Sequence, residues 1–476
     1  MFVLAFAAAF AARAEPLALD DAIRIALQKN PRIQVSAFSR DIARAGVLQQ
    51  LGHFDPALNF KRTYSQNDLP VTSGGLVTQF TQTDNYSLSL DGVLPWGLSY
   101  SLGGATQNQR GTFNAFAANY ATFGGVTVTQ PLLRGFGFGA NLADLRVAKA
   151  SRAISDWDHR QTVIDTVTSV IFDYNNVVEA RENVRIARFS RDLAAQLLDE
   201  NEKRNRVGAL SDADVTQARA RVANREESIL FALRSLRDTE NQLRARLGET
   251  RFSSDSPPLE LAPLPPVTPL TVSPEEDLRQ ALVLRPDYQS ARLGLARGRA
   301  NEVRAKNQLL PRVDFVGSYG YDGLDRDFAA SRRQVANEDH RAYSAGLVVS
   351  VPLTFAEGRG RERAARLALR QSEADLARLE QDIALSLTAA AGQIATTRLR
   401  VAATRTAFEL AKQALDAEQK RFRAGTSRTL DVLQLQEQLA SVEASQVRAL
   451  ADERRALANY ERTLGVTLEH HQIAIN

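Results

Sequence analysis

The strongest constraint on the fold is that the second half of the chain repeats the first. The segment DAIRIALQKNPRI, which begins at Asp21, is matched by EDLRQALVLRPDY, which begins at Glu276. The same offset aligns three further pairs of residues, Pro56 with Pro311, Phe60 with Phe315 and Tyr64 with Tyr319. A match that holds over such a distance predicts a tandem duplication of one structural unit.

Two later matches define how far each copy extends. The segment VTVTQPL, ending at Leu132, matches LVVSVPL, ending at Leu353, and RVGALSDADV from Arg206 matches RAGTSRTLDV from Arg423. The number of residues that separates matching positions is smaller at these two matches than in the opening segments. The first copy therefore holds additional residues, which include an extra hairpin near residues 86–102. Between the copies, residues 253–273 form a linker whose prolines deny it a regular helix.

Each copy is predicted to contain a helix, strands, a very long helix, a turn and a returning helix. The first copy, residues 15–252, has these elements at 17–50, 57–132, 140–205, 206–211 and 212–247. The second copy, residues 274–476, has them at 274–309, 312–355, 358–422, 423–428 and 429–464. The fold class expected from this order is mostly α with a β region in each copy.

The β regions alternate apolar and hydroxyl side chains. YSLSL at residues 86–90 and LSYSL at 98–102 place Tyr or Leu on one face and Ser on the other. A barrel between lipid and water requires such faces, and aromatic residues, which favour membrane interfaces, are concentrated in both regions. A soluble β-sandwich with an aromatic core is the alternative that this pattern leaves open.

The long helices carry a seven-residue repeat. No proline interrupts residues 360–422, where the apolar positions are Leu387, Ile394, Val401, Phe408, Leu415 and Phe422. A heptad pattern predicts helices packed side by side as in a coiled coil. Residues 140–205 and 358–422 would each form a helix of about 100 Å, which no compact globular core needs.

The first residues of the chain and its composition indicate export and exclude several kinds of site. Residues 1–14, MFVLAFAAAFAARA, are interpreted as a signal peptide that ends in a small-x-small pattern, although no basic residue precedes the apolar run and a plain helical turn is the alternative. No other apolar run is long enough for a membrane helix, so a chain of this kind would cross a membrane as a β-barrel. The absence of cysteine excludes disulfides, Cys nucleophiles, Cys metal sites and a lipid-anchored N-terminus.

At this point the chain resembles the TolC-type outer membrane factor family, also called outer membrane efflux proteins. The resemblance rests on the duplicated opening segments, on the strand-to-helix junction TQPLLRGFGFG and on the two "RxG" segments that end in Asp214-Val215 and Asp431-Val432. It implies a homotrimer with one 12-stranded barrel, four strands from each chain, joined to an antiparallel α-helical periplasmic tunnel. The implied function is passive export across the outer membrane, in a tripartite efflux or type I secretion system.

The resemblance also implies partners and site residues. The partners are a periplasmic adaptor protein, an inner-membrane pump and outer-membrane lipid. The tip residues that would contact the adaptor are Arg206, Val207, Gly208, Arg423, Ala424 and Gly425. The periplasmic gate would involve Asp431, Gln434 and Asp214, and Gln434 departs from the family, which has a second aspartate there. The alternative for the aspartates is a helix cap, and for the glycines a left-handed helix end.

No catalytic, cofactor or metal site is expected. The run from Gly135 to Ala140 imitates a dinucleotide-binding fingerprint, but the following helix continues instead of returning to a parallel strand. The five histidines are scattered, and the nearly balanced 59 basic and 55 acidic residues do not indicate nucleic acid as a partner. The other alternative function, a soluble periplasmic coiled-coil adaptor, would suit one hairpin and a compact β-domain better than two copies with amphipathic strands.

Overall fold

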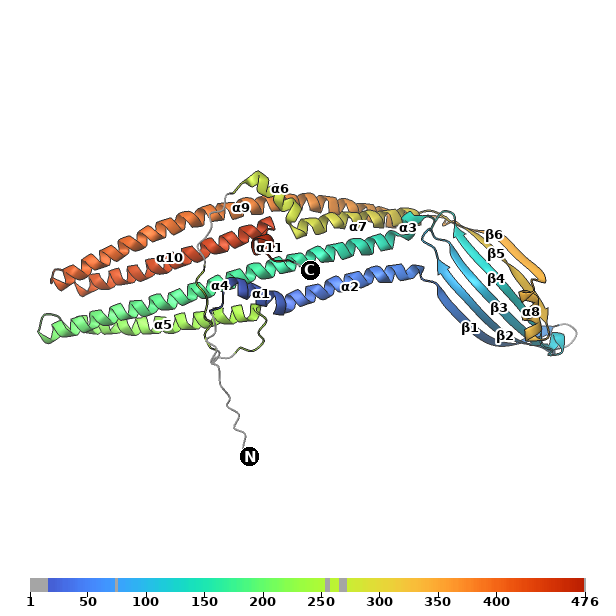
Figure 1. Cartoon of the computed structure of the whole chain (residues 1–476), viewed down its shortest axis with the longest axis horizontal. Helices are drawn as coiled ribbons and strands as arrows, with labels where there is room; N and C mark the ends of the chain where they lie inside the picture. The colour runs from blue at the N-terminus through green and yellow to red at the C-terminus, as the bar shows by residue number, and fades with distance from the viewer. Residues whose placement is uncertain (1–15, 73–75, 253–256, 265–271, 475–476) are drawn as a thin grey trace, which may run out of the picture. The chain divides into compact units, whose positions relative to one another are not determined.

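A computed structural model describes residues 16–72, 76–252, 257–264 and 272–474, so the expected signal peptide and much of the linker lie outside the described residues. The chain divides into two compact units (Figure 1). The helical unit comprises the described residues of Met1–Ser39, Trp157–Gln289 and Arg378–Asn476, and the strand unit comprises Arg40–Asp156 and Ser290–Ala377. Each unit therefore draws on both copies of the duplication.

The helices of the two copies correspond in order. In the first copy they are α1 (Leu19–Lys29), α2 (Pro31–Leu51), α3 (Phe138–Asn141), α4 (Ala143–Arg206) and α5 (Asp212–Arg246). In the second they are α6 (Pro274–Leu284), α7 (Pro286–Gln308), α8 (Phe328–Ala336), α9 (Ala356–Arg423), α10 (Thr429–Leu464) and α11 (Thr467–His470). Two short 3-10 turns, η1 (Gly52–Phe54) and η2 (Thr112–Asn114), lie beside strands.

The opening segment of each copy is two helices rather than the single helix expected. Asn30 and Arg285 are extended, with ψ of 122° and 121°, and each immediately precedes a proline. The proline ring disfavours the α conformation in the residue before it, so the chain bends there and starts a new helix. Because Pro31 and Pro286 occupy equivalent positions in the repeat, both copies break at the same place.

Long helices bury their heptad positions inside the helical unit. On α9, the heptad residues that are at most 5% exposed are Leu387, Ile394, Leu415 and Phe422. On α4, the equally buried residues Val170, Val177 and Val184 have the same seven-residue spacing. The fully buried Tyr174 also lies on α4, and its hydroxyl is 2.9 Å from the carbonyl oxygens of both Leu17 and Ala262. The core thus fixes the start of the first copy and the linker that follows it, as well as the long helices.

The strand unit is built on one antiparallel sheet of six strands in the order β1-β2-β3-β4-β5-β6. The strands are β1 (Ala57–Thr72), β2 (Leu76–Val93), β3 (Ser99–Gly111), β4 (Tyr120–Pro131), β5 (Arg312–Asp325) and β6 (His340–Ser350). The expectation of four strands per chain is therefore wrong. The difference is the extra hairpin of the first copy, whose two added strands pair within the sheet instead of folding apart from it.

The two faces of the sheet differ in chemistry. One row of cross-strand partners is apolar on all six strands: Leu58, Leu90, Leu102, Val126, Tyr319 and Tyr343. The adjacent row, on the opposite side, is small or hydrophilic: Ala57, Asp91, Ser101, Thr127, Ser318 and Ser344. These rows define what we call the apolar face and the polar face. Much of the apolar face is uncovered in the single chain, as for Leu58, which is 73% exposed.

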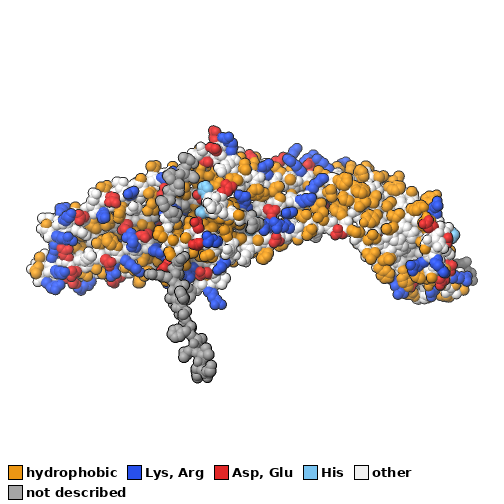
Figure 2. All heavy atoms as spheres, in the orientation of Figure 1, with side chains coloured by type: hydrophobic (Ala, Val, Ile, Leu, Met, Phe, Trp, Pro, Cys, Tyr) orange, Lys and Arg blue, Asp and Glu red, His pale blue; other side chains and the backbone are white. Residues whose placement is uncertain are grey.

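Charged side chains are distributed unevenly over the surface. Figure 2 shows Lys, Arg, Asp and Glu intermixed along the helical hairpins, whereas the visible body of the sheet is mostly hydrophobic or small and polar. Charges gather again at the hairpin loops beside α8. Within the described part of the chain, none of the helices combines the length and the apolarity needed to cross a membrane.

Candidate functional site

The end of α4 and the turn to α5 contain three of the predicted tip residues, Arg206, Val207 and Gly208. Gly208 adopts a φ of +78°, in the left-handed region that favours glycine. Its amide donates to the Asn205 carbonyl at 2.8 Å, and the amide of Ala209 donates to the Arg204 carbonyl at 2.9 Å. This pair of hydrogen bonds is a Schellman motif, which satisfies the last carbonyls of α4 and reverses the chain.

The turn between α9 and α10 has the same geometry. Gly425 has a φ of +76°, and its amide donates to the Phe422 carbonyl at 3.0 Å. The amide of Thr426 donates to the Arg421 carbonyl, also at 3.0 Å. The duplicated RxG segments therefore fold into duplicate turns because each supplies a glycine at the position where a left-handed residue is required.

The structure brings the two turns together at one end of the helical unit. The Arg204 guanidinium donates to the Phe422 carbonyl at 2.9 Å and lies over the Phe422 ring, 4.2 Å from its centroid. Beneath them, α4, α9 and α10 share an apolar cluster that includes Leu197, Phe422 and Val432. The α4–α5 and α9–α10 hairpins lie side by side (Figure 1), and the six predicted tip residues are all exposed, with Val207 at 79%.

Both predicted gate aspartates form hydrogen bonds at the starts of their helices. The Asp431 carboxylate accepts the amide of Arg428 at 3.3 Å, and the Asp214 carboxylate accepts the Ser211 hydroxyl at 2.6 Å. Both residues are half-buried, whereas Gln434, one turn further along α10, is exposed. Among the hydrogen bonds found for the described residues, none joins Asp214 to Asp431. Each carboxylate therefore caps the start of its helix. This cap keeps both side chains near the tip.

Charged contacts between α4 and α10 form a second feature of this site, which we call the α4–α10 ladder. Its three shortest steps are Arg185 with Glu443 at 2.7 Å, Arg455 with Glu179 at 3.0 Å and Arg462 with Asp165 at 2.7 Å. These pairs hold the hairpin of the first copy to that of the second. Sequence reasoning missed them because charged residues on long helices resemble solvated faces, and the partners lie far apart in the chain.

Arg455 is the most enclosed arginine of the ladder, with a side chain 23% exposed. Its guanidinium donates to Asn176 at 2.6 Å, to Glu179 at 3.0 Å and to Asp452 at 2.6 Å. Burial lowers the pKa of Arg455, but the hydrogen bonds to Asp452 and Glu179 and the negative charges of these two residues together outweigh it, so the net pKa is raised. The hydrogen bonds to Glu182 and Glu443 likewise raise the pKa of Arg185. Both arginines therefore stay charged.

The glycine-rich junction after β4, whose sequence imitates a dinucleotide-binding fingerprint, is held in place by side-chain hydrogen bonds. The Gly135 amide donates to the Asn307 side chain at 2.7 Å, and the Asn141 side chain donates to the Gly135 and Gly137 carbonyls at 2.7 and 2.9 Å. The helix that follows, α4, continues for 64 residues. No cluster of three metal-ligating side chains occurs among the described residues.

The chain matches one protein family and is similar to two export or resistance proteins. The family model described as "Outer membrane efflux protein" matches residues 22–249 and 278–466. The pyoverdine export outer membrane protein OpmQ of Pseudomonas putida is 26% identical over 64% of this chain and 63% of its own length. The cobalt-zinc-cadmium resistance protein CzcC of Cupriavidus metallidurans is 24% identical over 69% of this chain and 74% of its own. The match to OpmQ thus spans less than two thirds of that relative.

Solved structures share the fold at low sequence identity. The outer-membrane channel OprN superposes with a TM-score of 0.73 at 19% identity, covering 94% of this chain and 89% of its own. The CmeC outer membrane channel of Campylobacter jejuni gives a TM-score of 0.72 at 13% identity, covering 94% and 86%. These superpositions establish a common fold.

Proposed function

The chain belongs to the outer membrane efflux protein family, and from this premise we propose that it is an outer-membrane channel-tunnel, a passive conduit for export. The observation that carries the proposal is the sheet with one apolar and one polar face, joined in the same chain to two long helical hairpins. An apolar face suits lipid and a polar face suits a water-filled lumen. OpmQ is named for pyoverdine and CzcC for cobalt, zinc and cadmium, so the proposal concerns the conduit and not one cargo.

The proposed assembly is a homotrimer in the outer membrane, with the helical hairpins in the periplasm. A periplasmic adaptor would dock on the exposed turns around Gly208 and Gly425, and an inner-membrane pump would engage directly or through the adaptor. The exposure of Val207 and the rigid pair of Schellman turns support a docking role, because a preorganised surface loses little entropy on binding. Export would begin when the adaptor and pump separate the hairpins.

Electron microscopy of the detergent-extracted chain tests this function. We expect threefold tubes longer than about 100 Å, since a helix of 64 residues alone is about 96 Å long. Compact particles that purify without detergent would instead support a soluble adaptor or another β-rich protein and would overturn the proposal.

Replacing Asp431 tests the proposed gate. In a threefold tunnel three Asp431 carboxylates would form an acidic ring, so Asp431→Ala should lower the cation-to-anion permeability ratio severalfold in planar bilayers and weaken block by multivalent cations. The matched control is Asp212→Ala, which removes a carboxylate outside the predicted gate from the first turn of α5 at a similar cost in helix stability, about 0.3–1 kcal/mol. Unchanged selectivity and block in the Asp431 variant would exclude this residue from the gate.

A further inference from the structure

The extra hairpin made by β2 and β3 has the chemistry of a membrane wall. Its residues continue the apolar row through Leu90 and Leu102 and the polar row through Asp91 and Ser101. A hairpin folded away from the wall would meet water on both sides, and nothing would then require it to match the faces of its neighbours. Both strands are long enough to span a membrane, with 18 and 13 residues against the roughly 9–11 that a tilted strand needs.

Contacts on the polar face join the extra hairpin to the strands around it. The Asp91 carboxylate on β2 accepts the side-chain amide of Asn59 on β1 at 2.7 Å and the hydroxyl of Ser101 on β3 at 2.6 Å. On the apolar face, the Thr106 and Thr122 hydroxyls lie 3.0 Å apart across β3 and β4. The hairpin is therefore bonded into the sheet on both of its sides.

The turn of the extra hairpin is also held in place. The amide of Gly137 donates to the carbonyl of Trp96 in the β2–β3 turn at 3.0 Å, and the Trp96 ring packs edge-on against Phe138 at 6.2 Å. A Cβ atom at Gly97 would lie 2.3 Å from the Gly135 carbonyl oxygen, so only glycine allows this approach. The turn thus packs closely against the junction that leads from β4 into the long helix α4.

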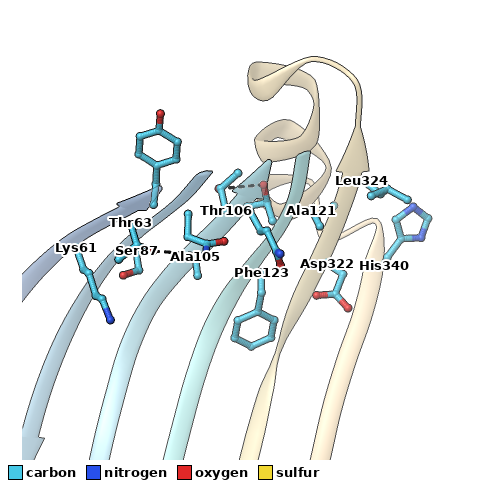
Figure 3. Close-up of a pocket in the computed structure, with 15 residues that line it drawn as sticks. Lys61, Thr63, Ser87, Ala105, Thr106, Ala121, Phe123, Asp322, Leu324 and His340 are labelled. Atoms are coloured by element: carbon cyan, nitrogen blue, oxygen red, sulfur yellow. Dashed lines mark hydrogen bonds between the residues drawn. The ribbon is translucent and has the colours of Figure 1, made fainter. Parts of the chain in front are cut away.

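The polar face of the sheet carries a hollow. Lys61, Phe123 and Asp322 project from this face, on the side of the sheet opposite to α8, whereas Thr106 points toward α8 (Figure 3). The hollow at this face has a volume of about 870 Å³. Lining residues come from all six strands, including Ser87 of β2 and Ala105 of β3. The added strands therefore contribute to the surface that would face the lumen.

Resting on the proposed function, we propose that three copies of this chain close an 18-stranded barrel, with β6 of each copy pairing with β1 of the next. The number of strands per copy is even, so β6 and the neighbouring β1 run antiparallel, as an up-and-down barrel requires. The partner at both unpaired edges is a second copy, because the apolar row ends on the exposed side chains of Leu58 at one edge and Tyr343 at the other.

The added strands widen the pore. With strands about 4.8 Å apart and tilted about 40°, eighteen strands give a backbone diameter of about 36 Å, against about 24 Å for twelve. The lumen of the barrel is then wide enough to remain an aqueous channel, as in porins with a similar number of strands. The narrowest part of the conduit would lie elsewhere than in the barrel.

Thiol labelling of the assembled chain tests whether β2 and β3 belong to the wall. The sequence contains no cysteine, so each variant carries one thiol. In proteoliposomes we expect Ser87→Cys on the polar face to react with a membrane-impermeant maleimide and Leu88→Cys on the apolar face to react at least tenfold more slowly. The reverse preference should hold for a maleimide confined to the lipid phase. The matched control pair is Thr127→Cys and Val126→Cys on β4, a strand outside the extra hairpin.

Two contrary results have different meanings. If Ser87→Cys and Leu88→Cys both react with the impermeant reagent while the β4 pair still alternates, the hairpin lies outside the wall; this inference fails and the proposed function stands. If the β4 pair also fails to alternate, the proposed function fails with it. A strand count in a cryo-EM map of the trimer gives a second measurement, in which eighteen supports the inference and twelve overturns it.

Discussion

Gly125→Val should abolish assembly of the protein in the outer membrane. Gly125 on β4 lies opposite Gly320 on β5, and a Cβ atom there would lie 2.3 Å from the Tyr319 carbonyl oxygen. A Cβ atom at Gly320 would lie equally close, at 2.3 Å, to the Gly124 carbonyl oxygen. Both obstacles are backbone atoms, so the strands would have to separate where the sheet curves. We expect a cost of about 4 kcal/mol or more and at least a tenfold loss of assembled protein in membrane fractions.

Gly346→Val is the matched control, because a Cβ atom at Gly346 on β6 meets nothing within 4 Å in the chain. Valine also favours strands, so this variant should assemble at the level of the unmodified protein. Heat-resistant oligomers on gels and the amount of protein in isolated outer membranes give the two readouts. Equal assembly of both variants would show that β4 and β5 are not crowded at Gly125.

Much of the sheet could be predicted from the sequence, but not its size. The Ser and Leu or Tyr alternation near Leu88 and Leu102 specifies which side chains share a face, because the period of a strand is two. Strand order depends on pairing between residues far apart in the chain, such as Val126 with Tyr319, and no local pattern encodes that. The nine-residue helix α8 also falls inside a region expected to contain strands only.

The breaks between α1 and α2 and between α6 and α7 have a local cause in the sequence, although the hydrophobic pattern indicated one continuous helix in each copy. Pro31 and Pro286 lie in the segments that revealed the duplication, and the residue before a proline avoids the α conformation. The tip turns show the opposite case. Gly208 and Gly425 were predicted as left-handed helix ends from residue type alone, and both have positive φ angles. Such local features can be predicted from the sequence because they do not depend on residues far away in the chain.

The functional site was less predictable than the turns within it. Whether Asp431 faces a pore depends on how copies of the chain pack, which a single sequence does not encode. The α4–α10 ladder depends on pairs such as Arg185 with Glu443, whose partners are on different copies of the duplication. Charge spacing along one helix cannot distinguish such a residue from one that forms only i,i+4 pairs.

Arg455→Met should make the channel open more readily. Loss of the guanidinium removes the contacts to Asn176 and Glu179 on α4 and leaves the Glu179 and Asp452 carboxylates close together without this cation. Breaking one partner of an enclosed charge network costs about 2–4 kcal/mol. If opening separates the hairpins, as proposed, this cost falls on the arrangement in which α4 and α10 are joined. Methionine keeps most of the aliphatic stem, so packing changes little. In planar bilayers we expect at least a tenfold rise in the open fraction at fixed voltage.

Arg448→Met separates the effect of the network from a simple loss of charge. Arg448 approaches the same Glu179 carboxylate at 3.6 Å, but its side chain is 65% exposed, so solvent already screens the pair. We expect less than a threefold change in its open fraction, consistent with the small value of exposed ion pairs. A similar open fraction for both variants and the unmodified chain would mean that the α4–α10 ladder does not oppose opening. A large response of both variants would instead assign the effect to net charge along the tunnel. Of these two arginines, Arg455 is the enclosed one, and its hydrogen bonds to α4 are ones that water does not replace at equal strength.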